Sequence, residues 1–175
     1  TLFPYTTLFR SGSGKSTIAN IIPRFFEIQS GEISINGQDI KKIPQKELRD
    51  KIGFVPQKAF LFSGTIEENI RYGKEDASIE EVKHAASIAQ ADEFISDMED
   101  KYDSFVAQGG NNLSGGQKQR ISIARALVRK PEVYVFDDSF SALDFKTDKR
   151  LRKALKNEIK DSSAIIIAQR ISTIM

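Results

Sequence analysis

The sequence predicts an α/β fold with a mostly parallel sheet and an inserted, mainly helical region. Two short apolar runs, residues 132–136 and 164–168, have the composition of strands buried on both faces. Each follows a segment with helical periodicity, and strands that alternate with helices favour a parallel sheet. Residues 59–118 are mainly helical in pattern, so we expect them to form a subdomain between two core segments, residues 12–58 and 119–175.

Turn and proline signals set the elements of the first core segment. Pro23 is expected to bend the first helix, and Asn36 with Gly37 is a strong hairpin signal. Pro44 opens a short helix, and Pro56 ends a short buried strand. The elements expected here are a helix over 16–26, strands over 32–35 and 38–40, a helix over 45–50 and a strand over 52–55.

Capping residues mark the helices that follow. Thr65 is a candidate N-cap, Ser78 and Glu81 form a capping box, and Pro131 closes a later helix. The helices expected are 66–71, 79–90, 92–98, 117–129 and 147–160, the last with a charged, solvent-exposed face. His84 falls on one of these helices, away from the glycine-rich motifs, so we expect a surface or packing role for it.

Composition excludes several classes of function. The 175 residues suffice for one domain with a core, and the net charge of +2 is too small to indicate a nucleic-acid-binding surface. The absence of cysteine excludes disulfides and thiolate metal sites, and the single histidine argues against a histidine metal site. No apolar run approaches the roughly 20 residues that a membrane-spanning helix needs.

Residues 1–11 differ from the rest of the chain. Their sequence, TLFPYTTLFRS, can be encoded by a widely used sequencing-adapter oligonucleotide. We therefore expect an adapter-derived, non-native segment joined to the gene, which fold reasoning leaves out. The alternative is a natural strand, residues 7–9, leading into a degenerate phosphate loop.

A phosphate-binding loop is predicted immediately afterwards. The pattern G-x-x-x-x-G-K-[ST] fits if Gly14 is its second glycine, although its first then falls on Phe9, where the turn costs about 1–3 kcal/mol of strain. Backbone N–H groups of such a loop cradle phosphates, the lysine reaches the β and γ oxygens, and the hydroxyl that follows binds Mg²⁺. The alternative is a Ser/Gly linker before a capped helix. The candidate nucleotide-binding residues are Gly12, Ser13, Gly14, Lys15, Ser16 and Thr17.

A second glycine-rich stretch precedes the helix expected at 117–129. Ser114 supplies a hydroxyl, and Gly115 and Gly116 lack the Cβ atoms that would hold an anion away from the backbone. Alone, such a stretch would be better explained as an ordinary glycine-rich loop that caps a helix. Its five residues are Leu113, Ser114, Gly115, Gly116 and Gln117.

These motifs, in this order and spacing, resemble the ATP-binding domain of ABC transporters. The resemblance covers residues 12–175 and implies a P-loop NTPase (RecA-like) core with a helical subdomain, truncated at both ends. It implies ATP and Mg²⁺ as cofactors, with Ser16, Gln57 and Asp137 at the metal and Asp138 and Gln169 in the hydrolytic machinery. Leu113–Gln117 resembles the signature motif, and the D-loop is matched by Ser141, Ala142, Leu143 and Asp144.

The resemblance also implies partners. Two such domains pair head to tail in the family, so that the signature of each completes the ATP site of the other. Phe60, Leu61 and Phe62 resemble the apolar patch on which a transmembrane coupling helix docks. A location at the cytoplasmic face of the cell membrane follows from this resemblance, and no nucleic-acid partner does.

Two residues depart from the family pattern. Asp138 stands where a glutamate usually polarises the attacking water, and its carboxylate is withdrawn by about 1.5 Å. A misplacement of about 1 Å can cost on the order of a hundredfold in rate. Gln169 stands where a switch histidine is usual, and an amide cannot shuttle a proton. Together they resemble the slowly hydrolysing, degenerate half of a heterodimeric multidrug-type exporter.

Two other readings compete with the exporter. A soluble ABC ATPase of DNA repair or chromosome maintenance would carry coiled-coil arms between Gln57 and Leu113, where no sustained heptads occur. A non-functional truncated fragment would share the family's motifs but bind ATP weakly.

Overall fold

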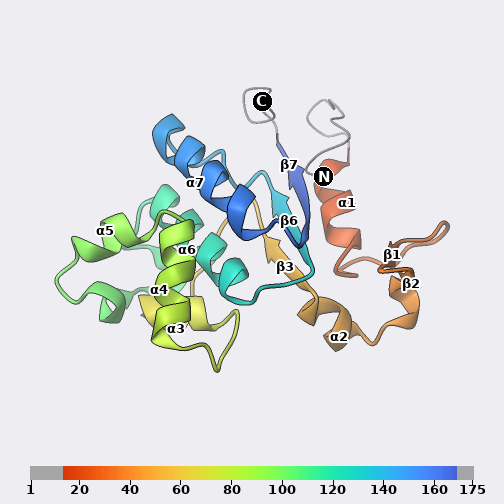
Figure 1. Ribbon diagram of the computed structural model, residues 1–175, viewed down its shortest axis with the longest axis horizontal. Helices are drawn as coiled ribbons and strands as arrows, with labels where there is room; N and C mark the ends of the chain where they lie inside the picture. The colour runs from red at the N-terminus through yellow and green to blue at the C-terminus, as the bar shows by residue number, and fades with distance from the viewer. Residues whose placement is uncertain (1–13, 169–175) are drawn as a thin grey trace.

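A three-stranded parallel sheet forms the centre of the computed structural model, which describes residues 14–168 (Figure 1). The strand order is β3 (Ile52–Val55), β6 (Val133–Asp137) and β7 (Ser163–Ile167). Both pairings are parallel, and Val135 of β6 lies opposite Phe54 on one side and Ile165 on the other. The carboxyl ends of the strands therefore meet at one edge, where ligands of open α/β sheets bind.

The central strand β6 explains why two cores form. All five of its residues are buried, as expected for a strand covered on both faces. Val133 and Val135 pack with Ala19 of α1 (Lys15–Ile21) in one cluster. Tyr134 and Phe136 point the other way, into a larger cluster formed mainly by helices. Successive side chains of β6 point to opposite faces of the sheet, so α1 packs on one face and the other helices pack on the opposite face.

The larger core is built by helices on the left of Figure 1. Their bounds are α3 (Ile66–Arg71), α4 (Ile79–Ile88), α5 (Asp92–Ser96), α6 (Gly115–Val128) and α7 (Phe145–Glu158). Ser78 forms the expected capping box with Glu81, and Thr65, expected as an N-cap, also forms a capping box with Glu68. No helix between Gln57 and Leu113 exceeds the ten residues of α4, so this segment holds no coiled-coil arm.

Short elements complete the fold. The expected hairpin is present as β1 (Ser34–Ile35) and β2 (Gln38–Asp39), and α2 spans Gln45–Asp50 as predicted. A second small pair joins β4 (Gly64–Thr65) to β5 (Phe105–Val106). The remaining turns are the 3-10 helices Ile40–Lys42, Lys101–Asp103 and Gln108–Gly110. Within residues 14–168, no helix has both the length and the apolar composition to span a bilayer.

The first helix is shorter than its pattern predicts. α1 ends at Ile21 instead of continuing to Phe26. Pro23 has no N–H to donate to the carbonyl of the preceding turn, and Arg24 adopts a left-handed conformation at φ 52°. The other expected elements agree with the structure within two residues at each end, although β7 is partly exposed where the sequence predicts a buried strand.

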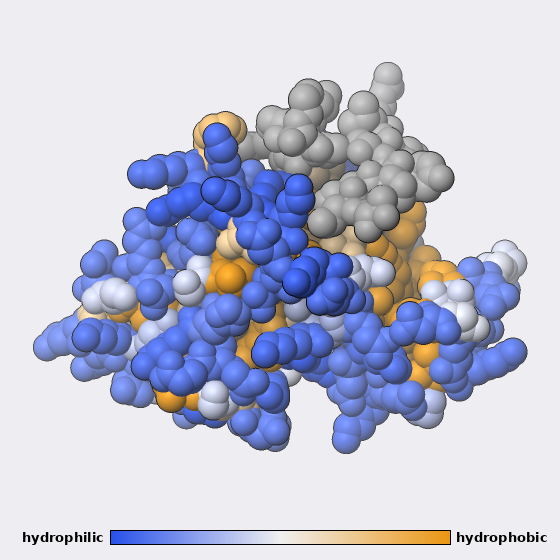
Figure 2. All heavy atoms as spheres, viewed as in Figure 1, coloured by the Kyte–Doolittle hydropathy of each residue, from blue (hydrophilic) through white to orange (hydrophobic). Residues whose placement is uncertain are grey.

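The charged helix is exposed as expected. In α7 the buried residues are Thr147, Leu151 and Leu155, and the remaining positions are charged or polar apart from Ala154 and the exposed Phe145. Figure 2 shows this face of the molecule as mostly hydrophilic, including the region over α7. His84 lies on the surface, where its Nε2 is 3.0 Å from Glu158 Oε1 at the end of α7, which agrees with the packing role expected for it.

Candidate nucleotide-binding site

The start of α1 has the geometry of a phosphate loop in the part that the structure describes. Gly14 caps the helix in a left-handed conformation, φ 87°, which a residue without Cβ adopts readily. Among the described residues, no side-chain hydrogen bond caps this helix, and the N–H groups of a helix N-terminus are suited to an anion. Lys15 begins the helix, and Ser16 and Thr17 follow on its exposed side. Gly12 and Ser13 lie outside the described residues.

Ser16 meets the tip of the central strand. Its Oγ donates a hydrogen bond of 3.1 Å to Oδ1 of Asp137, although 121 positions separate the two residues. Asp137 is the last residue of β6 and is nearly buried. Burial raises the pKa of Asp137 above its ordinary value of 3.8, and the charge of Asp138 acts in the same direction. The Ser16 hydrogen bond and Lys15 oppose this rise in pKa.

Gln57 and Asp138 meet beside this pair. Nε2 of Gln57 donates to Oδ2 of Asp138 at 3.1 Å. The backbone of Asp138 turns sharply at φ 45°, a region that aspartate tolerates better than most residues. Two bonds hold this turn: the N–H of Asp138 donates to Ile167 O at 2.8 Å, and Ser141 Oγ donates to Asp138 O at 2.8 Å. The structure thus brings together the residues predicted for the metal and for the attacking water.

The donors at this edge fit Mg²⁺. The hydroxyl of Ser16, the carboxylate of Asp137 and the amide oxygen of Gln57 are hard oxygen ligands. Residues 14–168 hold no group of three or more His, Cys, Asp or Glu side chains that would bind a metal without further ligands. A Mg²⁺ ion is usually held by one or two carboxylates and completes its shell with phosphate oxygens and water, and Asp137 would be the carboxylate here.

The signature stretch caps another helix. Ser114 Oγ accepts from the N–H of Gln117 at 3.2 Å, and Gln117 Oε1 accepts from the N–H of Ser114 at 2.9 Å. A Cβ on Gly115 would meet nothing within 4 Å, so the fold of this chain does not require glycine there. Gly115 is exposed, whereas Leu113 is buried in the larger core. The open face of this stretch therefore points away from the chain's own interior.

The D-loop lies against the signature stretch. A Cβ on Gly116 would be 3.2 Å from the carbonyl oxygen of Ala142. Ser141, Ala142 and Asp144 are exposed. Asp144 caps α7 by accepting from the N–H of Thr147 at 2.9 Å, and hydrogen bonds from the side chain and the backbone of Thr147 lower the pKa of Asp144. The two motifs thus form one exposed surface, on the face of the sheet opposite α1 (Figure 1).

The apolar patch differs in one residue from the prediction. Phe60 and Phe62 are exposed, but Leu61 is fully buried in the larger core. Tyr72 takes its place on the surface, where it stacks on Phe62 with ring centroids 4.4 Å apart. Phe60, Phe62 and Tyr72 are called the aromatic patch below. The main chain alternates here, so neighbours of an exposed residue point inward.

Arg125 supports the aromatic patch from below. Its guanidinium lies over the rings of Phe62 and Tyr72, 5.4 and 5.9 Å from their centroids. It also donates to the carbonyl and side-chain oxygens of Asn69 and to the carbonyl of Phe60. Desolvation lowers the pKa of Arg125 to about 10.

Sequence reasoning missed three supporting residues, Arg125, Ser139 and Gln119. Ser139 Oγ donates to Val55 O at 2.8 Å, and Gln119 Nε2 donates to Pro56 O at 3.1 Å. A signal for Gln119 was present, because it shares a helix face with Ile123 and Ala126 and is therefore a polar residue at a core-facing position. Gln169, predicted as part of the site, lies outside the described residues.

Comparison with known proteins decides the family. A sequence model of the family described as "ABC transporter" matches residues 8–141. The chain belongs to the ABC transporter family. An uncharacterized ABC transporter ATP-binding protein, YfiB of Bacillus subtilis, is 50% identical over 165 residues, which are 94% of this chain and 28% of that protein.

Two other similar proteins are a flippase and an exporter by name. The ATP-dependent lipid A-core flippase of Desulfotalea psychrophila is 43% identical over 164 residues, 94% of this chain and 29% of that protein. A solved structure titled as a bacterial Atm1-family ABC exporter with ATP bound superposes with a TM-score of 0.90 at 43% identity, covering 94% of this chain and 29% of that one. The chain thus spans less than a third of the length of these relatives, as an ABC ATP-binding domain of P-loop NTPase fold.

Proposed function

We propose that this chain is the ATP-binding domain of an ABC exporter and that it couples ATP binding and hydrolysis to transport across a membrane. The observation that carries the proposal is the meeting of Ser16 with Asp137 and of Gln57 with Asp138 at the carboxyl edge of the sheet. The similarity to an exporter solved with ATP bound supports the choice of nucleotide.

The motif residues take separate roles in this proposal. The backbone of residues 12–17 and the ammonium group of Lys15 hold the phosphates. Ser16, Asp137 and Gln57 hold Mg²⁺, which neutralises phosphate charge when bound. Asp138 and Gln169 orient the water that attacks the γ-phosphate.

We further propose a head-to-tail pair with a second, different half-transporter. The exposed surface formed by Gly115, Gly116 and the D-loop supports this, because a nucleotide bound by a partner could reach it. Asp138 and Gln169 make this chain's own site slow, whereas its intact signature, Leu113–Gln117, completes the partner's faster site. The aromatic patch contacts the coupling helices of the transmembrane domains, which places the domain at the cytoplasmic face of the membrane.

The test uses the intact gene and its neighbouring homologue, expressed together. Replacing the partner's catalytic glutamate by glutamine should abolish most ATP turnover, because the partner's site carries it. Asp138→Glu in this chain should raise the residual turnover by restoring the reach of the carboxylate. Unchanged turnover after the partner's replacement would contradict the assignment of fast and slow sites.

We also propose bounds for the subdomain and an origin for the first residues. The subdomain boundaries at residues 58/59 and 118/119 are tested by limited proteolysis. Residues 1–11 are proposed to be adapter-derived because of their sequence, although the family match begins at residue 8, within this segment. A genomic read that continues upstream of Phe9 as coding sequence would contradict the adapter origin.

A further inference from the structure

Gln119 is a buried amide on the helix that carries the signature stretch. It is the fifth residue of α6 and only 2% exposed. A buried amide costs free energy unless it is hydrogen-bonded, so its partner is structurally important. Nε2 of Gln119 donates to the carbonyl oxygen of Pro56 at 3.1 Å.

The acceptor lies immediately before the Q-loop glutamine. Two side chains hold the end of β3 here: Ser139, from the turn after β6, binds the carbonyl of Val55, and Gln119 binds the carbonyl of Pro56. The next residue is Gln57, whose amide reaches Asp138 at 3.1 Å. The position of Gln57 therefore depends on a bond from the sheet and on a bond from α6.

The same helix begins at the signature stretch. Ser114 caps α6, and five residues of helix, about 7.5 Å of rise, separate it from Gln119. One continuous helix transmits a displacement of its first turn to its second, because its backbone hydrogen bonds resist extension. A displacement of α6 at Gly115 would therefore move the donor that holds Pro56.

We infer that Gln119 is a positioning residue that holds the Q-loop glutamine Gln57 in register with the signature helix. Through it, the engagement of the signature stretch by the partner's nucleotide changes the placement of Gln57 at this chain's own Mg²⁺ site. The inference rests on the proposed function, and it gives the two ATP sites of the pair a physical connection inside one chain.

The experiment uses the full-length half-transporter with its partner in lipid nanodiscs. Affinity of this chain for 8-azido-ATP is measured by photolabelling, once with Mg²⁺ and once with EDTA. The affinity with Mg²⁺ divided by the affinity with EDTA reports how well the site holds the cation. A change in general stability would alter both affinities and leave this ratio unchanged.

Gln119→Met keeps the length of the side chain and removes the amide donor. It should lower the ratio about fivefold, the worth of one hydrogen bond, and leave the affinity in EDTA unchanged. Gln57→Ala should lower the ratio as well, and Gln119→Met should add nothing in the Gln57→Ala background, since both act through one group. The control is Ser122→Ala, a buried polar residue of the same helix, which should keep the wild-type ratio.

The outcomes separate this inference from the proposed function. A normal ratio in Gln119→Met, or an additive effect in the double variant, would overturn the positioning role while leaving the ATP site intact. A normal ratio in Gln57→Ala would overturn the proposed role of Gln57 and this inference with it. If Gln119→Met does not fold, Gln119→Asn, which withdraws the amide by one methylene, is expected to show the same pattern.

Discussion

At the scale of single residues, Asp137 shows how a cation site is prepared. Its carboxylate is nearly buried at the end of β6, beside the carboxylate of Asp138. Burial raises the pKa of Asp137, so the folded chain favours its protonated form relative to the unfolded chain. At neutral pH the ionised group is held at a cost to folding, and a bound cation would relieve that cost.

Asp137→Asn should therefore stabilise the domain without nucleotide while abolishing its stabilisation by Mg²⁺ and ATP. In the wild type, the raised pKa of Asp137 stabilises the fold through the protonated carboxyl. This contribution is complete below the pKa of the unfolded chain, near 3.8, and is lost as the pH rises through the pKa of the folded chain. The gain in melting temperature of the variant should be a few degrees at pH 7 and vanish below pH 3.8.

Thermal unfolding across this pH range is the measurement. The matched control is Asp97→Asn, at an exposed carboxylate, which should change the melting temperature little at any pH. A loss of stability in Asp137→Asn at pH 7 would show that the carboxylate is well solvated in the fold.

At the scale of elements, α6 connects the signature stretch, the Q-loop and the aromatic patch. Ser114 caps its start, Gln119 reaches Pro56, and Arg125 in its last turn holds Asn69 and Phe60. The packing is tight, because a Cβ on Gly73 after α3 would be 1.9 Å from the carbonyl oxygen of Arg125. Displacement of this helix would therefore affect all three places.

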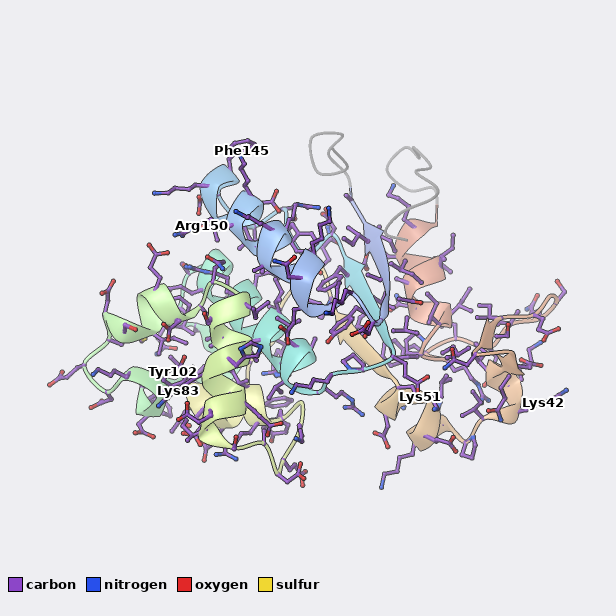
Figure 3. All side chains as sticks on the ribbon, viewed as in Figure 1. Lys42, Lys51, Lys83, Tyr102, Phe145 and Arg150 are labelled. Carbon is purple, nitrogen blue, oxygen red and sulfur yellow. The ribbon has the colours of Figure 1, made fainter. Side chains whose placement is uncertain are left out.

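Arg125→Lys should lower the free energy of unfolding by about 2–4 kcal/mol, because one ammonium cannot replace a planar group that binds several acceptors and stacks on two rings. The control is Arg150→Lys. Arg150 lies on the exposed face of α7 (Figure 3), and its guanidinium pairs with Glu93 of α5. That change should stay within about 0.5 kcal/mol. Urea denaturation measures the free energy of unfolding of both variants. Equal losses would mean that the contacts of Arg125 stabilise the fold no more than a surface ion pair does.

At the scale of the whole molecule, the sheet separates two surfaces with different tasks. The α1 side carries the residues predicted to bind this chain's own nucleotide, and the α6 side carries the signature stretch and the D-loop. The aromatic patch belongs to the helical part. An exposed cluster of aromatic rings is expensive in water and marks a contact surface.

Phe60→Ser should leave folding and ATP binding unchanged but reduce ATP-driven transport several-fold in the full transporter. Phe60 is 52% exposed, so its loss removes little buried area from this chain. Phe26→Ser is the matched control, because Phe26 is 56% exposed and follows α1, far along the chain from the aromatic patch. Transport per ATP hydrolysed is the measurement, and equal effects of the two variants would exclude a specific docking role.

Local sequence accounts for the elements of the fold. The N-cap at Thr65 and the capping box at Ser78 formed as predicted because both partners lie within one helical turn. The α/β class followed from strand composition, and the family resemblance predicted a shared site for Ser16, Gln57, Asp137 and Asp138, which the structure brings together. These features depend on neighbours that the local sequence already contains.

Only the tertiary structure decided which residues are buried together. Leu61 proved to be core, Tyr72 joined the aromatic patch, and Gln119 met Pro56 across 63 positions. Such contacts depend on which helix face packs on which strand, and many sequences with the same periodicity would pack differently. The physical reason is that hydrogen bonds within a turn are set locally, whereas burial is set by elements that only folding brings into contact.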